Sequence, residues 1–123
     1  RYQEHNGWEP IDIANVSYSL APKEFILVET YEYITVPNGY AVELKLKSSM
    51  ARQGFNHSLA FWVDPGWSGI LTMEIQNVTQ WHDLYLEYGM RFAQLIVHRL
   101  DQDAHEPYHG RYQNAGGVEA GKP

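Results

Sequence analysis

Apolar and polar residues alternate along most of this chain. In residues 42–47 and 71–76 every second side chain is apolar, and the residues between them are polar or charged. A period of two is typical of a β-strand that buries one face and exposes the other. Further segments rich in β-branched, aromatic and other apolar residues predict strands at 25–29, 32–36, 59–63, 83–86 and 91–99. The chain is therefore expected to consist mainly of short strands.

Turn-forming residues separate these segments at 21–22, 37–39, 64–66 and 88–89, mostly through Pro, Gly, Asn and Asp. Many short strands at this spacing predict an all-β sandwich, jelly roll or barrel. One segment has a helical pattern, Ser48–Gln53, and either Ser48 or Ser49 is expected to be its N-cap.

Composition narrows the class of protein. The 123 residues are enough for one hydrophobic core, so 1–123 is expected to be a single domain. A formal net charge of −6 argues against a nucleic-acid partner. No apolar run is long enough to span a bilayer, so no membrane association is expected. The absence of cysteine excludes disulfides and thiolate zinc sites and favours a cytoplasmic location. The chain starts at Arg1 rather than Met, so further N-terminal sequence is expected, and the Gly-rich tail 108–123 is expected to be flexible.

Residues 47–52, KSSMAR, place two hydroxyls and two cations on one turn. Ser48 and Ser49 can donate hydrogen bonds to an anion, while Lys47 and Arg52 supply positive charge. Taken alone, the motif is better explained as a capped turn with two solvated cations. Its functional interpretation is a phosphate-binding turn.

Two carboxylates follow this turn along the chain. Asp64 begins a DPG turn, where it can accept local N–H bonds or a bond from a substrate hydroxyl, and the local role is the simpler explanation. Glu74 lies on the polar face of its strand with Thr72 and Gln76. If that face lines a cleft, loss of solvent raises the pKa of Glu74 toward the range of a general base; if it faces water, it does not. Together with the phosphate turn, these residues indicate an enzyme acting on a phosphorylated small molecule.

The six histidines do not suggest a metal centre. His98, His105 and His109 lie in one segment, but their spacing crosses a Pro-containing loop and lacks an HExxH-type signature. No protein-held metal ion is therefore expected.

Four motifs occur in a fixed order: KSSMARQGF, VDPGWSGILTMEIQN, YGMRFAQL and PY…RYQ. Together they resemble the dCTP deaminase family of the dUTPase-like superfamily, over about residues 22–113. The resemblance implies a distorted β-barrel of jelly-roll type that forms a homotrimer with active sites shared between subunits. It implies dCTP and dUTP as small-molecule substrates and Mg²⁺ carried by the triphosphate. Zinc is not implied, because zinc deaminases need a His/Cys signature that this chain lacks.

The resemblance also assigns roles to individual residues. Glu74 would activate the water that attacks C4 of cytosine, and the backbone of Ala60 would contact the base. Asp64 would bind the deoxyribose 3′-hydroxyl, and Tyr108 and Arg111 would close over the phosphates. The full set of implied nucleotide-binding residues is Lys47, Ser48, Ser49, Met50, Ala51, Arg52, Asp64, Thr72, Met73, Gln94, Tyr108 and Arg111.

The chain departs from the family pattern at several positions. Lys47 stands where many members have Arg, and Ala115 replaces a glutamine of the tail motif. The N-terminal "QP-x-S-x-D" segment is not recognisable, which suggests truncation or a divergent, viral member. Trp62 stands where deaminase-only members carry Arg and where the bifunctional, dUMP-forming members have an aromatic residue. Trp62 therefore favours a bifunctional enzyme.

Two other functions compete with the deaminase. One is a dUTP pyrophosphatase without deamination, but the tail lacks the family's Gly-rich phosphate-closing motif and Glu74 is the residue that deamination needs. The other is a non-catalytic nucleotide-binding or regulatory relative, supported by the divergent tail and the missing N-terminal motif.

Overall fold

The structure is a computed structural model that describes residues 9–57, 62–119 and 121. Within these residues the chain forms strands and one short helix: β1 (Tyr18–Leu20), β2 (Phe25–Thr35), β3 (Tyr40–Leu46), α2 (Ser48–Gln53), β4 (Phe55–His57), β5 (Trp62–Val63), β6 (Ser68–Asn77), β7 (Leu84–Leu86) and β8 (Ala93–Arg99). The all-β prediction is therefore confirmed.

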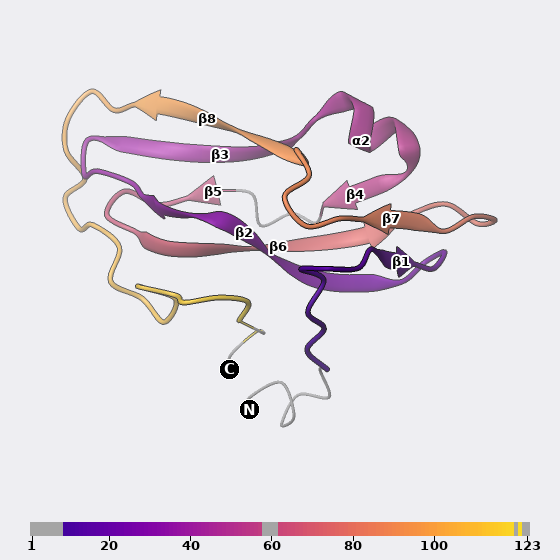
Figure 1. The fold of residues 1–123 in the computed structure, drawn as a ribbon. Coiled ribbons are helices and arrows are strands. Elements are labelled where there is room, and N and C mark those ends of the chain that lie inside the picture. Colours follow the sequence, from indigo (N-terminus) through magenta and orange to yellow (C-terminus); the bar gives the residue numbers. More distant parts are fainter. Residues whose placement is uncertain (1–8, 58–61, 120, 122–123) are drawn as a thin grey trace.

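The strands pair into three antiparallel sheets with the orders β1-β7, β2-β6-β4 and β5-β3-β8. In Figure 1 the β3–β8 layer lies over the β2–β6 layer, and α2 lies at one end of the molecule. The described strands do not close into a barrel, so the expected barrel is corrected to packed sheets. Sheets of few strands can bury one face each against the other without closure.

Strand alternation determines which residues form the core. On β6 the buried side chains Met73, Ile75 and Asn77 alternate with the half-buried Thr72, Glu74 and Gln76, as the sequence pattern predicts. One cluster of buried apolar residues lies between the sheets: Leu20, Leu44, Phe55, Met73, Ile75, Leu84, Leu86 and Phe92. A second cluster contains Val36, Val42, Val63, Trp67 and Ala115. Glu74 is therefore held on a strand whose other face is anchored in the core.

Several predicted boundaries change. The segments predicted at 25–29 and 32–36 join into β2, with an irregularity in the pairing between Glu29 and Tyr33. The predicted strand 59–63 is described only at its end, as β5, because 58–61 lie outside the described residues. Strands β1 and β4 were not predicted, since three residues are too few to establish a period.

The helix prediction is confirmed, but its predicted cap is wrong. Lys47 is the N-cap, in an extended conformation, and no side chain makes a capping hydrogen bond. The backbone carbonyl of Lys47 accepts hydrogen bonds from the N–H groups of Met50 and Ala51. The helix ends at Gly54, whose φ of 113° is accessible mainly to glycine. Ser48 and Ser49 are exposed, so their hydroxyl groups are not needed for capping.

Candidate active site

Glu74 is partly withdrawn from water although it lies on the polar face of β6. Its cross-strand neighbour on β2 is Leu27. One carboxylate oxygen, Oε1, is buried and makes no hydrogen bond within the described residues. Burial raises the pKa of Glu74, while a backbone hydrogen bond and the charge of nearby His57 act in the opposite direction. A half-buried carboxyl group with an unused acceptor is suited to take a proton from a ligand or from water.

The raised pKa has a consequence for folding stability. Ionising Glu74 costs more in the folded chain than in the unfolded chain, so its stabilising contribution is complete below the ordinary pKa of 4.5 and is lost as pH rises through the folded-state pKa. Glu74→Gln cannot ionise. We therefore expect the variant to be more stable than the wild type at neutral pH, with a difference that shrinks as pH falls toward 4.5.

Urea unfolding followed by circular dichroism at neutral pH and near pH 4.5 measures this difference. Glu106→Gln is the matched control, because Glu106 is an exposed residue of the loop after β8. A difference between wild type and Glu74→Gln that does not change with pH would contradict the partial burial of this carboxyl group.

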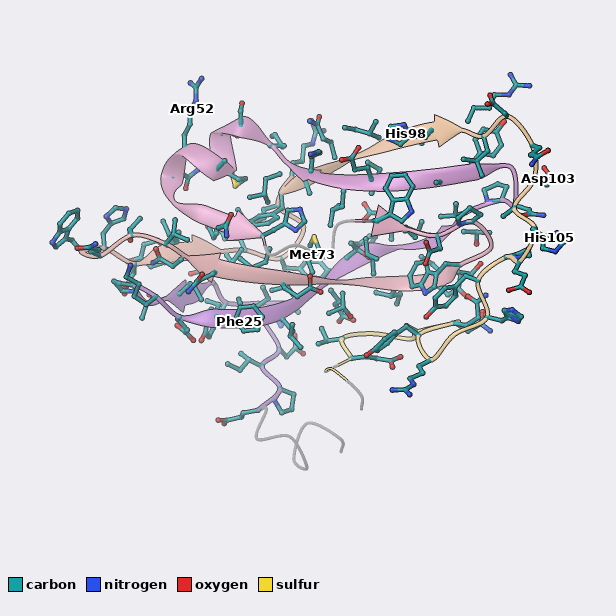
Figure 2. All side chains as sticks on the ribbon, turned by 180° about the vertical axis from the view of Figure 1, so that it is seen from behind. Phe25, Arg52, Met73, His98, Asp103 and His105 are labelled. Atoms are coloured by element: carbon teal, nitrogen blue, oxygen red, sulfur yellow. The ribbon has the colours of Figure 1, made fainter. Side chains whose placement is uncertain are left out.

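The predicted phosphate turn lies on α2 at the outer surface. Ser48, Ser49, Ala51 and Arg52 are exposed, and Met50 packs against the larger core cluster. In Figure 2 the Arg52 side chain points away from the sheets. A shallow depression of about 470 Å³ is lined by residues 51–54 together with Thr79 and residues 82–85. The exposed cation and hydroxyls of α2 could contact an anion without rearrangement of the core.

Asp64 lies far from α2 within one chain. Val63 pairs with Val42 on β3, which places Asp64 beside position 41, while α2 follows the opposite end of β3 after position 46. At about 3.3 Å per residue, this length of strand separates Asp64 from Lys47 by about 20 Å. The structure therefore does not bring Asp64 and the predicted phosphate turn together within a single chain. Tyr108, which is predicted to close over the phosphates, does lie next to Asp64, since its N–H donates to the carbonyl of Pro65.

A second cavity is a wide groove of about 2260 Å³. It runs between β2, the N-terminal segment 9–14, the turn before β8 and the segment 116–119. Three of the predicted nucleotide-binding residues, Lys47, Met73 and Gln94, line it. Tyr31 and Tyr88 meet edge to face at its border, with ring centroids 5.8 Å apart. The groove is large enough for a ligand or for part of another chain.

The tail lies along its own β6 rather than over α2. The N–H of Ile70 donates to the carbonyl of Ala115, and the N–H of Glu119 donates to the hydroxyl of Thr72. In Figure 1 the tail and α2 are on opposite sides of the molecule. Tyr108 and Arg111 are therefore not near the predicted phosphate turn of the same chain. Flexibility of the whole tail 108–123 stays a prediction, since these contacts concern only its described part.

Trp62 belongs to a small polar cluster on the outer face of β5-β3-β8. Its indole ring, with 52% of the residue exposed, lies against the His98 ring at a centroid distance of 5.7 Å. His98 Nε2 is 3.1 Å from Glu43 Oε1, and Lys45 Nζ is 3.2 Å from Glu43 Oε2. These hydrogen bonds lower the pKa of Glu43. Ala60, the predicted base contact, lies outside the described residues.

Sequence reasoning did not find two residues near these sites. His57 lies close enough to Glu74 for its charge to influence that carboxyl group, and its Nε2 is 3.2 Å from the carbonyl of Leu44. Gln113 connects the tail to the turn that contains Asp64. His57 lies in none of the four motifs, and Gln113 ends the PY…RYQ motif but has no predicted role there.

No group of three or more His, Cys, Asp or Glu side chains that could hold a metal ion occurs in the part of the chain that the structure describes. In the same part, no helix has the length and apolar character needed to cross a membrane.

The fold is similar to solved dUTPase structures. The native EIAV dUTPase has a TM-score of 0.61 at 25% identity, and the match covers 76% of each chain. A mutant dUTPase from phage phi11 of S. aureus has a TM-score of 0.62 at 16% identity, covering 77% of this chain and 78% of that chain. These similarities define the class as an all-β protein with a dUTPase-like fold.

Residues 1–100 match the family model described as dCTP deaminase-like, so the chain belongs to the dCTP deaminase-like family. The dCTP deaminase of Thermococcus kodakarensis is 42% identical over 97 residues, which is 79% of this chain and 61% of that protein. The dUMP-forming dCTP deaminase of Persephonella marina is 33% identical over 118 residues, or 96% of this chain and 65% of that protein. The chain spans about three fifths of the length of these relatives. The family resemblance inferred from the four motifs is confirmed.

Proposed function

We propose that this protein hydrolyses the 4-amino group of dCTP and then cleaves the product to dUMP and pyrophosphate. One observation supports the deamination step. In this member of the dCTP deaminase-like family, Glu74 is half-buried, and one of its carboxylate oxygens makes no hydrogen bond within the described residues. Trp62 and the dUMP-forming relative that aligns with 96% of the chain support the second step. Both steps act on the same nucleotide, so one binding site suffices.

In the proposed deamination, the Glu74 carboxylate accepts a proton from water, and the resulting hydroxide attacks C4 of cytosine. The tetrahedral adduct then collapses. One proton of the attacking water reaches N3 of the ring, and the hydroxyl proton of the adduct passes to the amino nitrogen. The C4–N bond then breaks, ammonia leaves, and C4 becomes the carbonyl carbon of uracil. Glu74 serves as base in the first step and as acid in the second. A carboxyl group with a raised pKa is better suited to this double role than one with the ordinary pKa.

The other predicted residues bind the nucleotide in this proposal. Exposed hydroxyls of Ser48 and Ser49, with Lys47 and Arg52, contact the triphosphate, and Asp64 accepts a hydrogen bond from the 3′-hydroxyl. The remaining predicted contacts are the backbone of Ala60 to the base and the side chains Met50, Ala51, Thr72, Met73, Gln94, Tyr108 and Arg111.

A homotrimer with shared sites is part of the proposal. Asp64 and α2 are about 20 Å apart along one chain, whereas the sugar and phosphates of one nucleotide are adjacent. If both contact the same nucleotide, they must come from different subunits. The tail supports this arrangement, because it lies far from α2 of its own chain.

Mg²⁺ would be held by the triphosphate, as the family resemblance implies. Its role when bound would be to neutralise phosphate charge. The cysteine-free composition fits a cytoplasmic location.

Product analysis with dCTP and with dUTP tests this function. Ammonia and pyrophosphate from dCTP, together with pyrophosphate from dUTP, are the expected products. Ammonia alone would limit the enzyme to deamination. No product from either nucleotide would favour a non-catalytic nucleotide-binding or regulatory relative.

A dUTP pyrophosphatase without deamination is the second candidate. The similarity of the fold to the EIAV dUTPase, at 25% identity over 76% of the chain, favours it. Pyrophosphate from dUTP with no ammonia from dCTP would support this candidate and contradict the first.

A further inference from the structure

The Gln113 side chain uses both ends of its amide to hold the turn that follows β5. Its Oε1 accepts a hydrogen bond from the N–H of Ser68 at 2.7 Å. Its Nε2 donates to the carbonyl of Gly66 at 2.9 Å and to the carbonyl of Tyr108 at 3.0 Å. One side chain thus joins two backbone segments more than 40 residues apart in sequence.

Neighbouring contacts make the same connection. The N–H of Tyr108 donates to the carbonyl of Pro65 at 2.7 Å, and the indole N–H of Trp67 donates to the carbonyl of Tyr112 at 2.8 Å. A Cβ at Gly66 would lie 2.7 Å from the Cβ of Pro107, so the turn and the tail are in close contact. The start of the tail therefore packs directly against the turn.

This turn determines where the Asp64 carboxylate lies. Residues 64–67 form a type II turn, with Pro65 at the second position and Gly66 at the third with a φ of 89°. The N–H of Trp67 donates to the carbonyl of Asp64 at 3.2 Å, and the N–H of Gly66 donates to the carbonyl of Val36 at 2.8 Å. The turn is thus hydrogen-bonded to Val36 through the N–H of Gly66 and to Gln113 through the carbonyl of Gly66.

We propose that Gln113 is a positioning residue that fixes the Asp64 turn and thereby sets the preference of the site for nucleotides with a 3′-hydroxyl group. The inference rests on the proposed function, because it assumes that Asp64 accepts a hydrogen bond from that hydroxyl. Without Gln113, Gly66 and Ser68 lose their side-chain partner, and the turn has more conformations available to it. Asp64 then meets the hydroxyl in the correct orientation only part of the time.

The test compares the affinity for dCTP with the affinity for 2′,3′-dideoxy-CTP by isothermal titration calorimetry. Glu74→Gln is the parent protein, so that the nucleotide is not consumed during the titration. A hydrogen bond to a carboxylate predicts that the parent prefers dCTP by about tenfold or more. Adding Gln113→Ala should reduce this preference to about threefold or less, with affinity for the dideoxy nucleotide changed by no more than about twofold.

Gln113→Glu is a second variant of nearly the same shape. It keeps an acceptor for the Ser68 N–H but loses both donated hydrogen bonds, so it should also reduce the preference. Gln102→Ala, in the exposed loop after β8, is the matched control and should leave the preference unchanged. Thermal melting confirms which variants are folded.

The outcomes separate the two proposals. If a folded Gln113 variant keeps the full preference for dCTP, the positioning role is overturned while nucleotide binding stands. If the parent binds neither nucleotide, the proposed function fails and the positioning role fails with it. If both affinities fall equally in the Gln113 variants, the residue supports the structure of the site but does not select the 3′-hydroxyl.

Discussion

Glu74→Gln is expected to reduce release of ammonia from dCTP by roughly a hundredfold to ten-thousandfold, the usual contribution of a general base. Glutamine has nearly the same shape and can fill the same space on β6, but it cannot accept the proton of water. The Met73 and Ile75 side chains on the other face of the strand stay buried, so the fold should be retained. Ammonia release under saturating dCTP measures the effect on the chemical step.

The dissociation constant of dCTP for the same variant distinguishes an effect on the chemical step from an effect on binding. We expect the dissociation constant to change by less than about tenfold, because the base takes part mainly in the transition state. Glu106→Gln, at an exposed loop position, should retain wild-type activity. If Glu74→Gln kept wild-type activity, another group would have to be the base.

Mixing two impaired variants is expected to restore part of the activity. Arg52→Ala removes a predicted phosphate contact and Asp64→Ala removes the predicted sugar contact, and each should lower kcat/KM by about tenfold to a hundredfold. Asp64 is about 20 Å from Lys47, which directly precedes the helix that carries Arg52. A nucleotide that contacts both Arg52 and Asp64 is therefore expected to lie between subunits. If sites are shared between subunits as proposed, some sites in mixed oligomers then combine an intact Asp64 with an intact Arg52.

Co-expression of the two variants with different affinity tags yields the mixed oligomers. With random assembly, about one quarter of the sites contain both intact residues, so activity should recover to about a quarter of the wild-type value. A mixture of Arg52→Ala with Gln102→Ala, which is expected to have wild-type activity, measures how activity changes when active subunits are diluted by impaired ones. If mixing leaves the activity at the level of the separate variants, Arg52 and Asp64 act in the same subunit or do not share a nucleotide.

Much of the fold could be predicted from local pattern. Alternation at 71–76 correctly placed Glu74 opposite the buried face of β6, and Ser48–Gln53 was correctly predicted as the helix. The N-cap could not be predicted correctly, because Ser48 and Ser49 are favourable cap residues but the backbone of Lys47 already occupies that position. Strands β1 and β4 are defined by their partners rather than by their own sequence.

The candidate site was less predictable than the fold. The four motifs identified the family, since their order and spacing are more specific than any one of them. Which of these motifs come close together in the fold depends on strand register, and the motifs themselves do not reveal the register. The contacts of Gln113 join residues 45 and 47 positions apart, so no local period could reveal them. Burial of Glu74 Oε1 likewise depends on tertiary packing.

The proposed reaction replaces the 4-amino group of cytosine with oxygen from water. Incubation with dCTP in water labelled with heavy oxygen, followed by mass spectrometry of the pyrimidine product, tests it most directly. We predict one labelled oxygen at C4 of uracil and an equal amount of ammonia. Unchanged cytosine, with label only in the phosphate products, would contradict the proposed deamination.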